Sequence, residues 1–91
     1  MSLKAGDVDR MWSKLGYEID AKRDHVTAWL YVDGRLVAYT KRSHGKPKIE
    51  GPVIHMIRRQ MLLNKPQFDL ALACPLNRAE YHEILRDQGA L

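Results

Sequence analysis

Four histidines are the side chains of this 91-residue chain that are best suited to proton transfer near neutral pH. They are separated by 19, 11 and 27 residues, and they are His25, His44, His55 and His82. These separations give no helical i, i+4 pair and no clustered set of ligands, so we expect no metal site. The glycines near the basic residues lack the spacing of a phosphate-binding loop, and the sequence predicts no cofactor.

His25 is the strongest candidate for a catalytic side chain. It stands at the start of an expected strand, shortly after Lys22 and Arg23, where an imidazole can exchange protons with a bound ribose-phosphate. A second interpretation stays open, in which His25 is a solvent-exposed histidine at the end of a strand. His44 is expected in a loop beside Gly45, and the mobility of such a loop suits proton transfer less well.

Two nucleophilic side chains are weaker candidates. Ser43 is next to His44 in the sequence, whereas a nucleophile and its base have to be brought together by the fold. Cys74 is the single cysteine, and its apolar neighbours are typical of a buried structural thiol. A lone cysteine also excludes an internal disulfide, so packing must hold the domain together.

Basic residues are concentrated in the middle of the chain. Residues 21–60 hold nine Lys and Arg against three Asp and Glu, within a net charge of +4 for the whole sequence. Such a segment suits a polyanion, because each phosphate that a cation neutralises releases counterions. A solvated basic surface without such a partner is the alternative. The side chains expected to contact RNA phosphates are Lys22, Arg23, Lys41, Arg42, His44, Lys46 and Lys48.

The length predicts one small domain with a single core. No stretch approaches the ~20 apolar residues that a membrane-spanning helix needs, and the N-terminus lacks the apolar core of a secretory signal. We therefore expect a cytoplasmic protein without a membrane partner. Residues 1–3 are expected to be a leader outside the fold.

The periodicity predicts a helix followed by three strands. Val8, Met11, Trp12 and Leu15 form one helical stripe, so a helix is expected over residues 5–15, ending at Gly16. Alternation predicts a short strand over residues 17–21. Two further strands, over residues 26–32 and 35–41, flank Asp33-Gly34, which is a strong signal for a type I′ hairpin turn.

A two-residue turn pairs Leu30 with Val37 and Ala28 with Tyr39, which divides the hairpin into two faces. The face expected under the helices carries Val26, Ala28, Leu30, Val37 and Tyr39. The opposite face carries His25, Thr27, Trp29, Tyr31, Leu36 and Thr40. On this second face Trp29 and Tyr31 are expected to stack on RNA bases.

The rest of the chain is expected to form a basic loop and three helices. Residues 41–51 lack periodicity and predict a loop, and Pro52 begins a helical stripe that reaches Asn64. A short helix is expected around residues 68–72, and Asn77 with Glu80 predicts a capping box for a last helix that ends at Gly89. The fold class is therefore α+β, a two-layer sandwich in which a three-stranded antiparallel sheet has helices on one face.

Residues 4–68 resemble the HicA family of toxins, which are messenger-RNA interferases with a double-stranded-RNA-binding-like α-β-β-β-α fold. Residues 69–91 extend beyond the match as a C-terminal helical extension of the same domain. The matching elements, in chain order, are Lys4-Ala5-Gly6-Asp7-Val8, Leu15-Gly16-Tyr17, His25 with Trp29, Asp33-Gly34-Arg35, the basic residues 41–45, residues 48–52 and residues 54–60.

The resemblance implies that His25 is the catalytic histidine of a metal-independent ribonuclease. It would act as general base on a ribose 2′-hydroxyl or as general acid to the leaving oxygen, with Lys22, Arg23, Lys41 and Arg42 on the phosphates. Where the family carries Gly-Ser-His, this chain has Arg23-Asp24-His25. Asp24 would either hold the imidazole or repel phosphate.

Three hypotheses for function follow. The first is a toxin-like domain that binds and cleaves RNA, with a cognate antitoxin protein as a further partner that covers its basic face. The second is an RNA-binding module of the same fold without catalysis. The third is a protein-interaction domain that forms a homodimer through its open sheet face.

Overall fold

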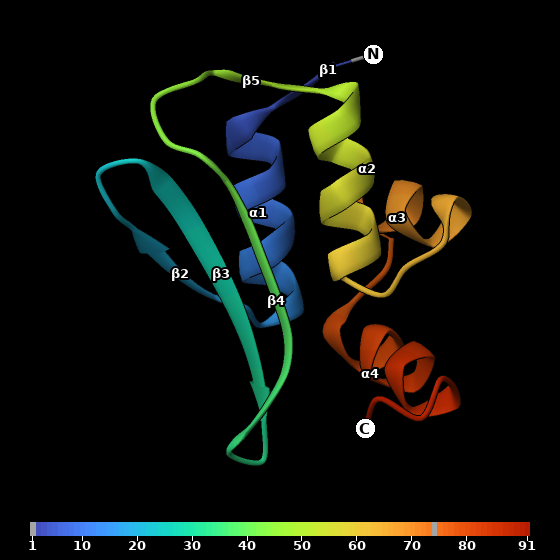
Figure 1. The fold of residues 1–91 in the computed structure, drawn as a ribbon. Helices are drawn as coiled ribbons and strands as arrows, with labels where there is room; N and C mark the ends of the chain where they lie inside the picture. Colours follow the sequence, from blue (N-terminus) through green and yellow to red (C-terminus); the bar gives the residue numbers. More distant parts are fainter. Residues whose placement is uncertain (1, 74) are drawn as a thin grey trace.

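The computed structural model describes residues 2–73 and 75–91. The predicted buried thiol of Cys74 lies outside these residues. Four helices and five strands follow one another along the described chain (Figure 1). In order they are β1 (Ser2–Lys4), α1 (Ala5–Leu15), β2 (Glu18–Ala21), β3 (His25–Val32), β4 (Arg35–Ser43), β5 (Lys48–Glu50), α2 (Gly51–Gln60), α3 (Lys65–Leu72) and α4 (Arg78–Asp87).

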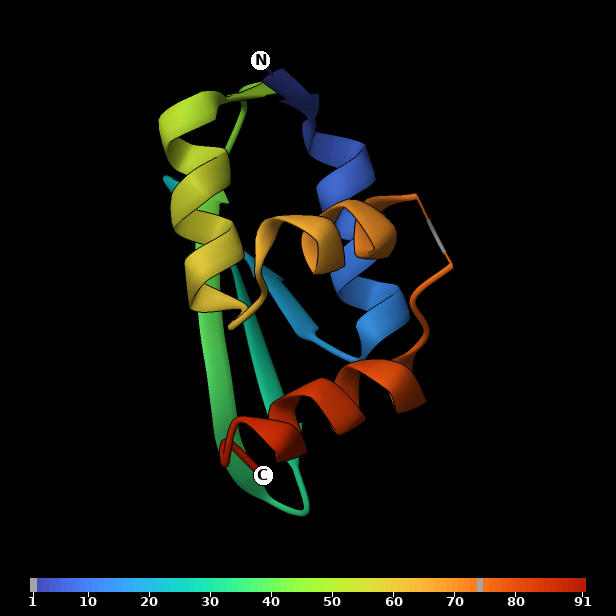
Figure 2. The same cartoon turned by 90° about the vertical axis from the view of Figure 1, so that its right-hand side faces the viewer.

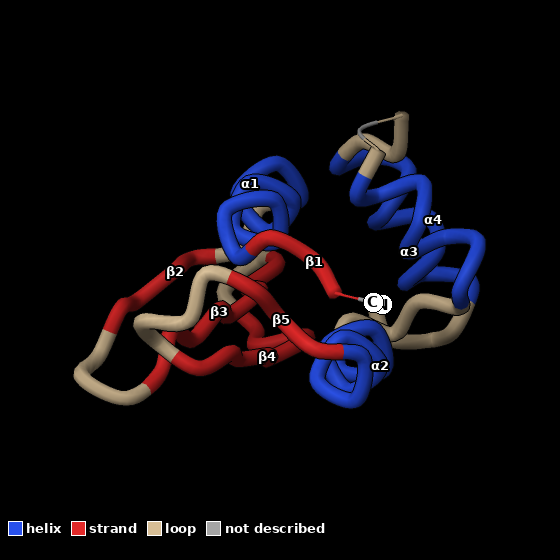
Figure 3. Tube along the Cα trace, turned by 90° about the horizontal axis from the view of Figure 1, so that it is seen from above, coloured by secondary structure: helices blue, strands red, loops and turns tan. Residues whose placement is uncertain are grey.

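The predicted α+β class and the three-stranded antiparallel sheet are confirmed. The strand order is β2-β3-β4, with α1 against β2 and α2 against β4. Both α3 and α4 contact α1 and lie on the side of the first two helices that is turned away from the sheet (Figure 2). Seen from above, the helices gather on one face of the sheet (Figure 3). None of the helices in residues 2–73 and 75–91 is long and apolar enough to cross a bilayer.

A second, two-stranded sheet corrects two predictions. Ser2 and Leu3 of the predicted leader belong to the fold, because β1 pairs with β5 and places Leu3 opposite Ile49. Residues 41–51 are not one loop, because β4 extends to Ser43 and β5 begins at Lys48. The buried Ile49, between an exposed lysine and an exposed glutamate, supplies the alternation that forms this strand.

The hairpin turn at Asp33-Gly34 has the predicted geometry. Both residues have positive φ, 52° and 79°, as a type I′ turn requires. The pairs nearest the turn, Val32 with Arg35 and Tyr31 with Leu36, are those expected from a two-residue loop. Beyond them a β-bulge inserts Val37, so that Leu30 pairs with Ala38 instead.

The bulge makes the predicted faces of β4 wrong beyond Val37. A shift of one residue moves every following side chain to the other face of the sheet. Tyr39, predicted to lie under the helices, is 42% exposed, whereas Thr40, predicted to lie on the open face, is fully buried. On β3, the side chains predicted to lie under the helices are Val26, Ala28 and Leu30, and all three are buried.

Replacing Thr40 with Val is expected to stabilise the domain by about 1 kcal/mol. The Thr40 hydroxyl is buried and has no hydrogen-bond partner among the described residues, so the isosteric change removes a desolvated polar group. Urea denaturation measures the difference in unfolding free energy. Thr27→Val is the control and should change this free energy little, because the Thr27 hydroxyl is not one of the buried polar atoms without a partner, although its side chain is only 7% exposed. Equal effects of the two variants would contradict the pairing of Thr40 with Ala28.

Capping residues set where the helices begin and end. Gly16 adopts a left-handed conformation with φ of 97° and closes α1 where predicted. The second predicted helix ends earlier than Asn64, because the chain turns at Leu62, whose φ is 64°. Asn64 instead caps α3 and forms a capping box with Gln67, so this helix starts before the predicted residue 68. The capping box of Asn77 and Glu80 is confirmed.

Two buried tyrosines join the C-terminal helix to the rest of the domain. The Tyr81 hydroxyl donates to the carbonyl oxygen of Met61 at 2.8 Å and lies 2.5 Å from the Tyr17 hydroxyl, which then donates to it. Their rings stack with centroids 6.1 Å apart. Residues from α3 and α4, including Phe68, Tyr81 and Leu85, therefore belong to the same core as the sheet.

Candidate functional site on the open face of the sheet

The pairing register determines which side chains share the face turned away from the helices. Residues paired directly across antiparallel strands project to the same side. His25 pairs with Ser43, Thr27 with Lys41, and Trp29 with Tyr39. On β2, Glu18 pairs with Trp29 and Asp20 with Thr27. We call the surface formed by these paired residues, together with Tyr31 and Leu36, the open face. It comprises Glu18, Asp20, His25, Thr27, Trp29, Tyr31, Leu36, Tyr39, Lys41 and Ser43.

His25 begins β3 and is exposed at one end of the open face. Ser43 lies directly across from it, and Lys41 is its diagonal neighbour on β4. Two backbone hydrogen bonds hold this end of the sheet. The Lys22 amide donates to the His25 carbonyl at 2.8 Å, and the His44 amide donates to the Asp24 carbonyl at 3.1 Å. The turn that precedes His25 is thus bonded to the loop that carries His44.

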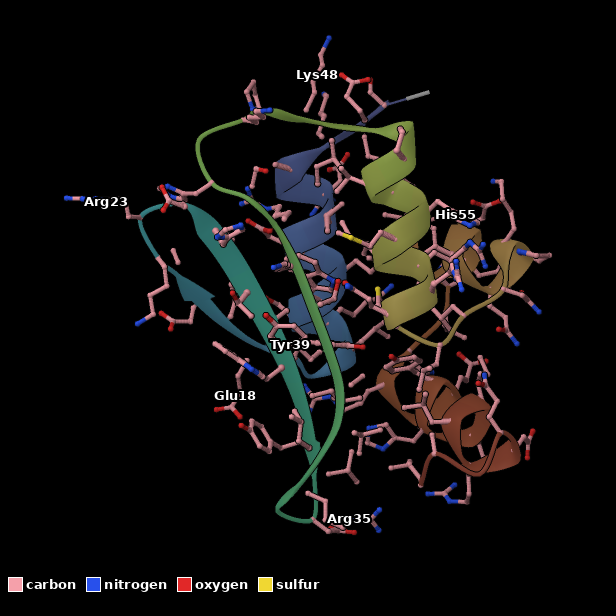
Figure 4. All side chains as sticks on the ribbon, in the orientation of Figure 1. Glu18, Arg23, Arg35, Tyr39, Lys48 and His55 are labelled. Carbon is pink, nitrogen blue, oxygen red and sulfur yellow. The ribbon has the colours of Figure 1, made fainter. Side chains whose placement is uncertain are left out.

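Four of the predicted phosphate contacts gather around this end of the sheet. Lys22 and Arg23 are exposed in the β2–β3 turn, and His44 and Lys46 are exposed in the loop after β4. A small hollow lined in part by Ser43, Lys46 and Lys48 continues from this loop to β5. Arg23 and Lys48 project near this end of the sheet, whereas Arg35 lies at the opposite end (Figure 4).

Arg42 is directed away from this group. It lies on the helix side of β4, where its guanidinium forms a bidentate pair with Asp9 of α1, at 2.8 Å and 2.7 Å. The side chain is only 10% exposed. A guanidinium held by a carboxylate in this way is occupied, so Arg42 joins the sheet to α1 and is left out of the RNA-contacting set.

The middle of the open face carries an aromatic pair. The ring centroids of Trp29 and Tyr39 lie 6.0 Å apart with an interplanar angle of 48°. Tyr31 and Leu36 continue the apolar surface toward the hairpin turn and are 48% and 53% exposed. Sequence reasoning identified Trp29 and Tyr31 but missed Tyr39, because the bulge at Val37 was not predicted.

Acidic side chains border the open face along β2. Glu18 and Asp20 line a shallow depression together with Ile19, Trp29 and Tyr31. The Asp20 carboxylate lies 3.1 Å from the Lys22 ammonium, in an exposed pair that is weak. The positive charge of the face is therefore concentrated at the His25 end and along β4, away from the β2 edge.

No group of three or more His, Cys, Asp and Glu that could hold a metal ion occurs in residues 2–73 and 75–91. Comparisons with protein families, with curated proteins and with solved structures each find no match for this chain. The resemblance to HicA toxins therefore rests on the matching residues alone.

Proposed function

We propose that this chain binds single-stranded RNA across the open face of its sheet. The observation that carries the proposal is the pairing of β3 with β4, which places the half-buried Trp29 and the exposed Tyr39 in the same row of the sheet as each other. Lys41 and the exposed His25 lie next to this pair on the same face. Exposed aromatic rings stack on unpaired bases, and neighbouring cations bind the phosphates that link them.

The charges suggest a path for the RNA backbone. Phosphates would follow Lys41 toward Lys22, Arg23 and Lys46 at the His25 end, because Glu18 and Asp20 repel them from the β2 edge. The order α1-β2-β3-β4-α2, with the helices on one face, supports the proposed double-stranded-RNA-binding-like fold. In this proposal the open face, which the helices leave uncovered, is the RNA-binding surface.

We further propose that the bound RNA is cleaved at His25. The His25 imidazole would accept the proton of a ribose 2′-hydroxyl, and the 2′-oxygen would attack the adjacent phosphorus. The bond from phosphorus to the 5′-oxygen would break as that oxygen takes a proton from a water molecule. The products are a 2′,3′-cyclic phosphate and a 5′-hydroxyl end. Lys41, diagonal to His25, would stabilise the charge that develops on the phosphate.

Replacing Lys22, Arg23, Lys41 and Lys46 together with Ala is expected to weaken RNA binding and its dependence on salt. If each cation neutralises one phosphate, the slope of log K against log salt should flatten by about 3 units for single-stranded RNA. Fluorescence anisotropy with a labelled oligonucleotide, in EDTA and at several salt concentrations, measures this slope.

The matched control removes the same charge elsewhere, by replacing with Ala the four cations Arg10, Arg35, Arg59 and Arg86. It should lower affinity slightly and leave the slope nearly unchanged. Equal slopes for the two variants would contradict a phosphate path along the His25 end. An absence of RNA binding, with concentration-dependent dimerisation that Trp29→Asp abolishes, would favour a protein-interaction domain instead.

A further inference from the structure

A cavity of about 260 Å³ lies between α2 and α3, beneath β1. Its apolar lining comes from three elements and consists of Leu3, Ile54, Phe68 and Leu72. The polar side chains around it are His55 and Arg58 of α2 and Lys65 and Asp69 of α3. His55 lies on the side of α2 that is nearer to α3 (Figure 4). The cavity combines an apolar interior with a small polar rim, as ligand sites commonly do.

The Arg58 guanidinium is fixed in this rim by neutral partners. One terminal nitrogen donates to the carbonyl oxygen of Leu63 at 2.9 Å, and the other lies 2.9 Å from Nδ1 of His55. A guanidinium only donates, so His55 accepts at Nδ1 and its Nε2 carries the hydrogen of a neutral ring. Two hydrogen bonds thus hold the guanidinium in place beside a second donor.

No carboxylate compensates the charge of Arg58 within the part of the chain that the structure describes. The ion pairs formed there do not include Arg58. Lys65 and Asp69 pair with each other at 3.1 Å, and their charges cancel. The rim is therefore positively charged at Arg58, which is half-buried. An anion binds more strongly to a half-buried guanidinium without an acidic partner than to an exposed guanidinium, because water screens the exposed charge more.

We propose that this cavity binds a small organic acid, in which a carboxylate is attached to an apolar chain. The carboxylate would accept hydrogen bonds from Arg58 and from Nε2 of His55, and the chain would occupy the apolar interior. A free fatty acid and the C-terminal residue of an apolar peptide share this chemistry. The site does not depend on RNA binding, because α2 and α3 lie on the other side of the sheet from the open face.

The proposal is tested by titrating the full chain with octanoate and following its amide resonances by NMR. We expect saturable shifts at residues of α2 and α3, and binding about tenfold weaker for octan-1-ol, which lacks the carboxylate. Arg58→Gln should weaken octanoate binding by a similar factor, whereas Arg59→Gln on the same helix is the matched control and should not. Ile54→Trp, which fills the cavity, should abolish binding.

A second titration, with a tripeptide that ends in a free leucine carboxylate, distinguishes the two sources of the ligand. Tighter binding of either compound identifies its class as the ligand. The comparison of octanoate with octan-1-ol uses the unaltered chain, so it remains decisive even where Arg58→Gln disturbs the α2–α3 connection. Equal binding of the acid and the alcohol, or no saturable shifts at α2 and α3 with either carboxylate, would overturn the proposal.

Discussion

Replacing His25 with Ala is expected to lower the rate of RNA cleavage by about 10²–10⁴-fold and to leave RNA affinity nearly unchanged. The imidazole is the proposed site of proton transfer, and the phosphate contacts are assigned to other side chains. A quenched fluorescent oligonucleotide in EDTA gives the cleavage rate, and anisotropy gives the affinity. Analysis of the ends of the products should find a 2′,3′-cyclic phosphate.

His44→Ala is the matched control for His25. The loop that carries His44 is joined by a backbone hydrogen bond to Asp24, next to His25, but only His25 stands within a strand. We expect the His44 variant mainly to bind RNA more weakly. If cleavage survives the loss of His25 but not of His44, the catalytic centre belongs to the loop after β4. Binding without cleavage by the unaltered chain would favour the non-catalytic RNA-binding module.

Raising the pH above about 10 is expected to lower the free energy of unfolding by about 2.7 kcal/mol per pH unit. Burial raises the pKa of the Tyr17 and Tyr81 hydroxyls above their ordinary value, and for Tyr81 the neighbouring hydroxyl raises it further. In the unfolded chain both tyrosines lose their protons near pH 10, whereas the folded chain keeps them. The unfolded state therefore binds fewer protons, and stability falls as the pH rises. Urea denaturation at a series of alkaline pH values measures this slope.

Tyr17→Phe should halve this slope to about 1.4 kcal/mol per pH unit, because one titrating group remains. Tyr31→Phe, on an exposed ring of the open face, is the control and should leave the slope unchanged. A slope that is the same in the unaltered chain and in the Tyr17 variant would show that this pair does not govern alkaline unfolding.

Features that depend on a few neighbouring residues could be predicted from the sequence. The helix over residues 5–15, the turn at Asp33-Gly34 and the capping box at Asn77 all arise from local backbone preferences. The position of His25 and Trp29 on the same face follows from strand alternation once the turn is known.

Features that depend on distant partners could not be predicted in this way. The bulge at Val37 has no local signal such as glycine, and it decides that Tyr39 rather than Thr40 joins the open face. The strand Ser2–Lys4 exists because it pairs with residues 48–50 far along the chain. The sequence near Arg42 shows a basic run, and only the tertiary fold brings Asp9 to its guanidinium.

The hydrogen bond between Tyr17 and Tyr81 limits how early the domain can complete its folding during synthesis. The two residues that it joins lie 64 positions apart in the sequence. During synthesis a ribosome adds about 5–20 residues each second, so Tyr81 is added several seconds after Tyr17. The core around this tyrosine pair can close only after α4 has been synthesised.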